Sequence, residues 1–199
     1  MRPKDPDPAT RRRILDAAQC LMLSKGFVAT SVDEICGQAS VTKGTFFHYF
    51  ESKEELGKAA LDRFASGQEQ RFLEALSGIE DPLERVYRWI DCGIRAARDP
   101  STQGCLVGTF AQEISDTHPA LRRSCEQVFL KFVEAAGRDL ALAKERYAPQ
   151  ARFDAESVAG LFLAVVQGSM LIRKATGDRN QMEQNLLHLK SYLKELFGK

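Results

Sequence analysis

Five residues of one short segment have side chains suited to binding a nucleic acid. The segment contains basic, small, hydroxylic and aromatic types, namely Lys43, Gly44, Thr45, His48 and Tyr49. Cations and hydroxyl groups bind phosphate oxygens, and small residues permit close approach to a groove. From spacing alone, two interpretations stay open: a DNA-binding helix, or an ordinary solvated helix surface.

A second candidate for chemistry is Cys105, which follows the loop-like stretch 99–104 and begins a predicted helix. Free amides and the helix dipole at that point favour a thiolate, which reacts with electrophiles and oxidants. The alternative is a small buried apolar side chain, as most unpaired cysteines are. We expect Cys20 and Cys36 in the core of the N-terminal region, and Cys125 within a helix that has no comparable loop beside it.

Motifs of enzymes and metal sites are absent from the sequence. It contains no GxxxxGK[ST], GxGxxG, GxSxG or HExxH pattern, and His48, His118 and His188 lack the spacing of metal ligands. Five widely spaced cysteines without a CxxC pair predict neither a zinc ribbon nor a disulfide framework. We therefore expect no catalytic residue, no metal, no cofactor, and reduced thiols in the cytoplasm.

The charge is balanced, with 28 Lys+Arg against 27 Asp+Glu, but it is uneven along the chain. Residues 1–53 contain eight basic and six acidic side chains, so this part is slightly basic. The most apolar stretch, 160–172, is interrupted by Gln167 and Ser169 and is shorter than the ~20 residues that cross a bilayer. The sequence predicts no membrane partner.

The nucleic-acid candidates need two short helices to position them. Ser31 and Glu34 form a capping-box pattern that opens a helix at 32–39, and Thr42 caps a second helix at 43–50. A helix this short is unstable alone, so it must dock on its neighbours and present its other face. We expect the shared core of this unit to consist of Ile35, Ala39, Val41, Phe46 and Phe50.

The rest of the chain also has helical spacing and no hairpin signal, which predicts an all-α fold of about nine helices. Capping residues and Gly or Pro breaks mark the helix ends. The other predicted helices span about 7–26, 53–77, 82–98, 105–115, 119–147, 155–176 and 181–197.

The segment from Thr30 to Leu56, TSVDEICGQASVTKGTFFHYFESKEEL, strongly resembles the DNA-binding domain of TetR-family (tetracycline-repressor-type) transcription regulators. The resemblance implies a three-helix helix-turn-helix domain at 1–54 and a helical effector-binding and dimerisation domain at 55–199. It implies a homodimeric repressor that binds a pseudo-palindromic operator in double-stranded DNA and is released by a small-molecule effector. The alternative is a small-ligand-binding helical protein or an enzyme with a vestigial helix-turn-helix.

Carried over by position, the family implies a positioning helix at 32–39 and a recognition helix at 43–49. The residues implied to contact DNA are Thr30, Ser31, Lys43, Gly44, Thr45, Phe47, His48, Tyr49 and Lys53. Two positions depart from the family pattern: the turn residue that is often glycine is Ser40, and Phe47 lacks the hydroxyl of the tyrosine that is frequent there.

Two apolar stripes near the C-terminus predict a dimer contact, and the family resemblance implies that this contact is a four-helix interface. The candidates are Val158, Leu161, Phe162, Val165, Val166, Ser169, Leu186, Leu189 and Leu193. Since apolar stripes also build the core of one subunit, a core role, or both roles, stays open.

The effector pocket is expected among the middle helices, with Trp89, Cys105 and Phe110 as candidates. Aromatic residues at helical spacing more often belong to an ordinary core. Locally, the segments 104–108 and 111–116 resemble an electrophile- or acrylate-responsive subgroup of the same regulators.

Overall fold

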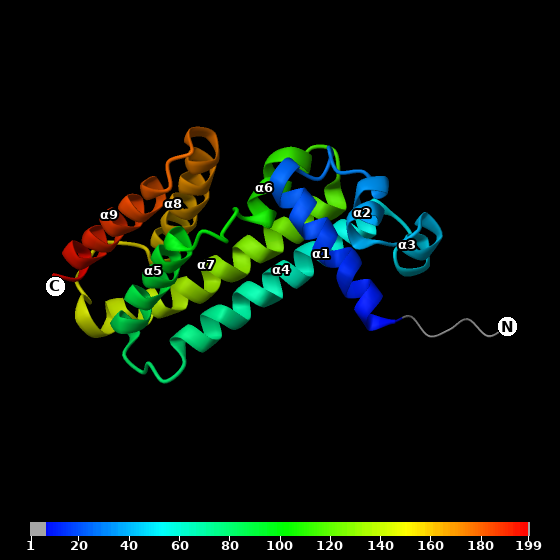
Figure 1. Cartoon of the computed structure of the whole chain (residues 1–199). Coiled ribbons are helices and arrows are strands. Elements are labelled where there is room, and N and C mark those ends of the chain that lie inside the picture. The colour runs from blue at the N-terminus through cyan, green and yellow to red at the C-terminus, as the bar shows by residue number, and fades with distance from the viewer. Residues whose placement is uncertain (1–6, 199) are drawn as a thin grey trace. The chain divides into compact units, whose positions relative to one another are not determined.

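The computed structural model describes residues 7–198, and within this range the chain consists of helices and short connections (Figure 1). The first six residues of the predicted 1–54 domain lie outside the described range. The helices of the described range are α1 (Pro8–Lys25), α2 (Val32–Ala39), α3 (Lys43–Tyr49), α4 (Lys53–Leu76), α5 (Pro82–Arg98), α6 (Leu106–Ile114), α7 (Pro119–Tyr147), α8 (Ala155–Thr176) and α9 (Asn180–Phe197). The predicted all-α fold is confirmed.

Residues at the helix starts explain where the helices begin. Asp7 and Asp81 each accept two backbone amides at the starts of α1 and α5, and each precedes a proline at the first helical position. Proline is favoured there because a backbone N–H at the first helical position has no acceptor within the helix, so its absence costs no hydrogen bond. Asp154 accepts the Ser157 amide at the start of α8. These caps place the helix boundaries within a residue or two of those predicted.

The chain divides into two compact units. The first contains residues 7–66 and 105–126, so it includes α1, α2, α3 and α6 and the start of both α4 and α7. Its core is built from fully buried side chains of these helices, among them Ile14, Met22, Ile35, Phe46, Leu61 and Phe110. Helix α6, which the sequence assigns to the effector domain, packs on α1 within this unit. A functional boundary at residue 54 stays a prediction.

The second unit contains residues 67–104 and 127–198, with α5, α8 and α9 as its complete helices. Helix α9 packs on both α5 and α8. A buried carboxylate lies in this unit: Asp139 accepts hydrogen bonds from Arg85 Nε and Trp89 Nε1, both at 2.8 Å. Both carboxylate oxygens are thus satisfied, which a buried charge requires.

Candidate nucleic-acid interface

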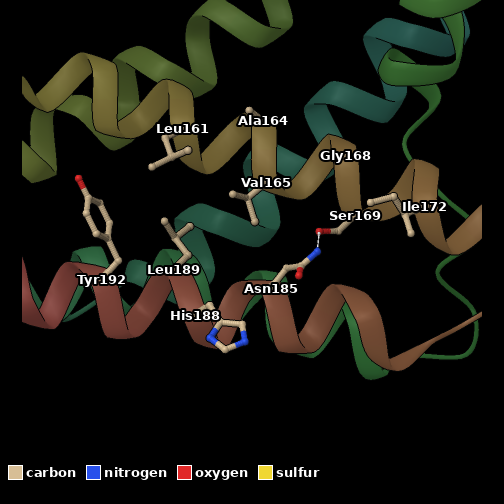
Figure 2. Close-up of a pocket in the computed structure, with 10 residues that line it drawn as sticks. All are labelled: Leu161, Ala164, Val165, Gly168, Ser169, Ile172, Asn185, His188, Leu189 and Tyr192. Carbon is tan, nitrogen blue, oxygen red and sulfur yellow. Dashed lines mark hydrogen bonds between the residues drawn. The ribbon is translucent and has the colours of Figure 1, made fainter.

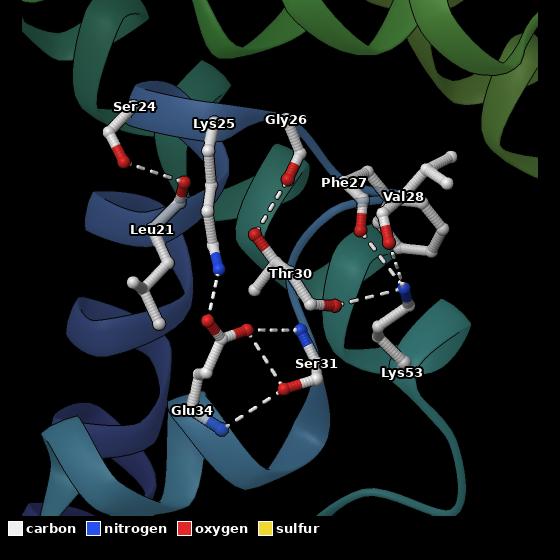
Figure 3. Close-up of polar contacts among 10 residues, drawn as sticks. All are labelled: Leu21, Ser24, Lys25, Gly26, Phe27, Val28, Thr30, Ser31, Glu34 and Lys53. Carbon is white, nitrogen blue, oxygen red and sulfur yellow. Dashed lines mark hydrogen bonds and ion pairs between the residues drawn. The ribbon is translucent and has the colours of Figure 1, made fainter.

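The N-terminus of α2 is fixed by a network around Glu34 (Figure 3). Glu34 accepts hydrogen bonds from the Ser31 amide at 2.9 Å and the Ser31 hydroxyl at 2.8 Å, and Ser31 Oγ accepts the Glu34 amide in return. The ion pair with Lys25, followed by the bonds from Ser31, lowers the pKa of Glu34 to about 2. The predicted capping box is therefore confirmed, and it fixes the free amides that open α2.

The turn between α2 and α3 contains Ser40 in the left-handed conformation, with φ 53° and ψ 51°. Among the described residues it is the one non-glycine with positive φ. A residue with a Cβ pays about 1–2 kcal/mol for this conformation. The Ser40 amide compensates by bonding to the carbonyls that end α2. Thr42 then caps α3 by accepting the Thr45 amide at 3.1 Å, as predicted.

Helix α3 has one buried face and one exposed face. Phe46 is fully buried and Phe50, which ends the helix, is 2% exposed, so these rings attach α3 to its unit. Lys43, Gly44 and His48 are exposed. The other predicted contacts of this helix, Thr45 and Tyr49, are half-buried, and Phe47 is 53% exposed.

The cation of α3 already has an anionic neighbour. Lys43 Nζ lies 2.8 Å from Asp33 Oδ1 of α2, and both side chains are largely exposed. The hydrogen bond that Lys43 donates to Asp33 raises the pKa of its ammonium group. Solvent screens an exposed ion pair of this kind and makes it weak, so a phosphate can compete for the lysine.

Two of the predicted DNA contacts, Thr30 and Lys53, bond to backbone carbonyls between α1 and α2. Thr30 is fully buried, and its hydroxyl donates to the Gly26 carbonyl at 2.6 Å. Lys53 Nζ donates to the carbonyls of Phe27, Val28 and Thr30 at 2.9, 3.3 and 3.0 Å (Figure 3). Both side chains therefore hold the loop between α1 and α2.

Sequence reasoning missed Glu113, a residue of α6 that binds this loop. Its carboxylate accepts the backbone amides of Phe27 and Val28. The contact joins residues more than eighty positions apart in the chain, so no local spacing pattern could have revealed it.

The three predicted effector residues lie in different surroundings. Phe110 is fully buried in the first unit, with its ring centroid 5.2 Å from that of Phe27. Cys105 belongs to the same unit; it is the N-cap of α6, half-buried, and its Sγ accepts the Gly108 amide at 3.4 Å. Trp89 belongs to the second unit, where it is 6% exposed and stacks 4.4 Å from Phe72.

The cysteines differ in accessibility. Cys36 and Cys125 are buried, and burial raises the pKa of Cys125 to about 11. Cys20, expected in the core, is exposed instead, because it lies on the outer side of α1, whose inner side is formed by residues such as Ala18 and Met22. Among the described residues, no group of three His, Cys, Asp or Glu side chains could hold a metal ion.

The predicted dimer residues fall into two groups. Six of them, all 6% exposed or less, are buried within the chain: Val158, Phe162, Ser169, Leu186, Leu189 and Leu193. The core interpretation left open above applies to this group, because α9 turns its regular leucine stripe toward α5 and α8. Val165 and Val166 are half-buried, and Leu161 is 42% exposed.

An open apolar groove of about 400 Å³ lies between α8 and α9 (Figure 2). Leu161, Ile172 and Tyr192 line it, and each is at least 40% exposed. Asn185 of α9 donates a hydrogen bond to Ser169 of α8 at 2.9 Å, and both residues line the groove. Helix α8 is long and apolar enough to cross a membrane by length and composition, with 22% of its most apolar window buried. The core helix of a soluble protein passes the same test.

These features define a helical protein with a helix-turn-helix unit. Residues 14–60 match the family described as bacterial regulatory proteins of the tetR family, and residues 82–189 match the tetracyclin-repressor-like C-terminal domain. The chain belongs to the TetR family and is a helix-turn-helix transcription regulator.

Transcriptional repressors of other bacteria are similar to nearly the whole length of this chain. The transcriptional repressor NemR of Escherichia coli K12 is 26% identical, covering 92% of this chain and 94% of NemR. The repressor DhaR of Mycobacterium sp. strain GP1 is 25% identical, covering 88% of each chain. The crystal structure of the reduced form of E. coli NemR superposes with a TM-score of 0.79 at 27% identity, covering 92% of this chain and 95% of that one.

Proposed function

We propose that the chain is a homodimeric repressor that binds a pseudo-palindromic operator and releases it when a small-molecule effector binds. The observation that carries the proposal is the exposed face of α3 beside a capped α2 N-terminus. A recognition helix of this kind enters the major groove, and a dimer presents two of them to successive grooves. The protein acts in the cytoplasm by binding, without catalysis.

The proposed DNA contacts follow from exposure. Lys43, His48 and Tyr49 bind phosphates, and Gly44 and Thr45 approach base edges. A Cβ built at Gly44 would lie 3.8 Å from Thr42 Oγ1 and would meet no other atom within 4 Å. The surroundings of Gly44 are therefore open for DNA. Phe47 offers an exposed ring for apolar contact with a thymine methyl. Ser31 contacts a phosphate at the α2 N-terminus, whereas Thr30 and Lys53 support the loop that precedes it.

The proposed dimer contact is the apolar face of α8 and α9. Leu161 and Tyr192 flank the groove between these helices, and Leu171 is also exposed on α8, at 51%. A second copy of this face covers the groove, because isologous pairing of one apolar patch is the common route to a symmetric dimer. NemR and DhaR are named repressors, which supports repression rather than activation of transcription by this chain.

The proposed effector is an electrophile or a small unsaturated molecule that reacts at Cys105. The half-buried sulfur at the first turn of α6 supports this, as does the description of a related structure as a reduced form. The rival is a carrier or enzyme of small apolar ligands with a vestigial helix-turn-helix. Specific, salt-sensitive DNA binding would exclude that rival.

The test starts from DNA fragments that the wild-type protein selects from a random pool. Lys43→Ala with Tyr49→Ala should weaken binding of the selected DNA by about a hundredfold or more, because each of the two lost bonds to a charged phosphate contributes roughly 1.5–3 kcal/mol and about 1.4 kcal/mol corresponds to a factor of ten. Because only Lys43 is charged, the double variant should also reduce the slope of log affinity against log salt by about 1. Circular dichroism checks folding. Unchanged affinity in the folded double variant would refute this interface.

A further inference from the structure

A carboxylate of α6 binds the loop that leads into the proposed DNA interface. Glu113 Oε2 accepts the Phe27 amide at 2.6 Å, and Oε1 accepts the Val28 amide at 2.9 Å. Both oxygens therefore bind neighbouring backbone groups. Bonds to a charged acceptor are about twice as strong as neutral ones.

The loop is shaped to admit this carboxylate. Gly26 ends α1 with φ +92°, a conformation that favours glycine. A Cβ at Gly26 would lie 2.6 Å from Glu113 Oε2 and 2.8 Å from Oε1. The absence of a side chain at Gly26 thus gives Glu113 the room it needs.

The carbonyls of the same loop are held by a cation. Lys53 donates to Phe27, Val28 and Thr30, and its Nζ lies 4.5 Å from the centroid of the Phe27 ring. Burial lowers the pKa of Lys53, and the nearby Glu113 charge opposes that shift. Segment 27–30 is therefore held through its amides by an anion and through its carbonyls by a cation.

We infer that Glu113 is a positioning residue for DNA binding, acting through segment 27–30 on the N-terminus of α2. The segment ends directly before Ser31, the N-cap of α2. A shift of Phe27 and Val28 therefore moves the free amides that open α2. The inference rests on the proposed DNA interface.

Electrostatics and positioning predict opposite signs for loss of Glu113. Removing a negative charge from a DNA-binding unit weakens its repulsion of phosphates, so charge alone predicts tighter binding. Loss of positioning predicts weaker binding. Asp116 is an exposed carboxylate three residues further along the same unit, so Asp116→Ala is a charge-matched control.

The experiment measures the affinity of Glu113→Ala, Glu113→Gln and Asp116→Ala for DNA selected by the wild-type protein. Glu113→Ala should bind about tenfold more weakly, and Glu113→Gln should be intermediate because its amide oxygen retains one acceptor. Asp116→Ala should bind as well as the wild type or better. The salt slope of the Glu113 variants should equal that of the wild type, because Glu113 touches no phosphate.

A second readout reports the contact itself. In amide NMR spectra, the Phe27 and Val28 resonances should shift in both Glu113 variants and stay in place in Asp116→Ala. Wild-type or tighter affinity in folded Glu113→Ala, or in Glu113→Gln where the alanine variant does not fold, overturns the inference. If the wild type itself selects no DNA, the proposed function fails instead.

Discussion

Glu34 shows how one carboxylate organises the start of the positioning helix. It binds the amide and hydroxyl of Ser31 and pairs with Lys25, which lies in the last turn of α1. One side chain thus caps α2 and ties it to the preceding helix. Because the ion pair requires the ionised form and a carboxylate accepts the other bonds more strongly than a neutral carboxyl, protonation of Glu34 weakens them together.

This dependence predicts an effect of acid on stability. The pKa of Glu34 falls from its ordinary 4.5 to about 2. Since the folded-state pKa is the lower one, the stabilisation is complete above the unfolded value and is lost as pH falls toward the folded value. The stability difference between wild type and Glu34→Gln should be constant above about pH 5 and should vanish near pH 2.

Urea unfolding at a series of pH values measures this difference. Subtracting the variant removes the contribution of other carboxylates that titrate in the same range, such as Asp7 and Asp81. Added salt should shrink the difference at neutral pH, because the Lys25 pair is partly exposed. A difference that persists unchanged at pH 2 would contradict the assignment.

Local patterns predicted the residue environments only where the partners are close in sequence. The Ser31 capping box and the Thr42 cap follow from a few neighbouring residues. The Thr30 hydroxyl bonds to Gly26, four residues away, whereas the partners of Lys53 lie more than twenty residues earlier in the chain, beyond the reach of any local pattern. Resemblance to a family assigned these two residues to phosphates, but it could not show that internal carbonyls already bind them.

At the scale of elements, helix type and boundaries were predictable but helix orientation was not. The stripe Met182, Leu186, Leu189 and Leu193 has the same spacing whether it faces a partner or its own core. The structure turns it inward, with each side chain at most 4% exposed. Which face of α9 is buried depends on the packing of α5 and α8, which the sequence of α9 alone does not contain.

This orientation changes which substitutions test the dimer. A charge at Leu189 or Phe162 would lie in the core of one subunit and unfold it, because both side chains are buried. Leu161 is a better probe, since it is 42% exposed and lines the groove between α8 and α9. Leu130 of α7, 51% exposed and not part of this groove, is a matched control.

We expect Leu161→Glu to dissociate the dimer and Leu130→Glu to leave it intact. An unpaired charge buried in an interface costs about 3–5 kcal/mol, which corresponds to a hundredfold or larger rise in Kd, at about 1.4 kcal/mol per factor of ten. Sedimentation velocity at micromolar protein gives the assembly state. As dimerisation is lost in Leu161→Glu, operator affinity should fall too. Equal dimerisation of the two variants would place the interface on another face.

For the molecule as a whole, one helix links the proposed effector chemistry to the proposed DNA interface. Cys105 is the N-cap of α6, and Glu113 lies near its other end. Both belong to the first compact unit, together with the segment that Glu113 binds. A change at the Cys105 sulfur that shifts α6 along or about its axis therefore displaces the Glu113 carboxylate from the Phe27 and Val28 amides.

The last prediction is that N-ethylmaleimide releases DNA through Cys105. The thiolate sulfur bonds to an alkene carbon, the π electrons pass toward the imide carbonyl, and the neighbouring carbon takes a proton from water. The adduct adds bulk where Sγ accepts the Gly108 amide, so α6 must shift and operator affinity should fall about tenfold, the loss expected when a charge-assisted contact breaks.

Cys20→Ser is the matched control, because Cys20 is the exposed thiol. Wild type and Cys20→Ser should release DNA, Cys105→Ser should retain it, and modification should add little in Glu113→Ala. Equal release from all the cysteine variants, or none from wild type, would leave a reversible, non-covalent effector as the better explanation.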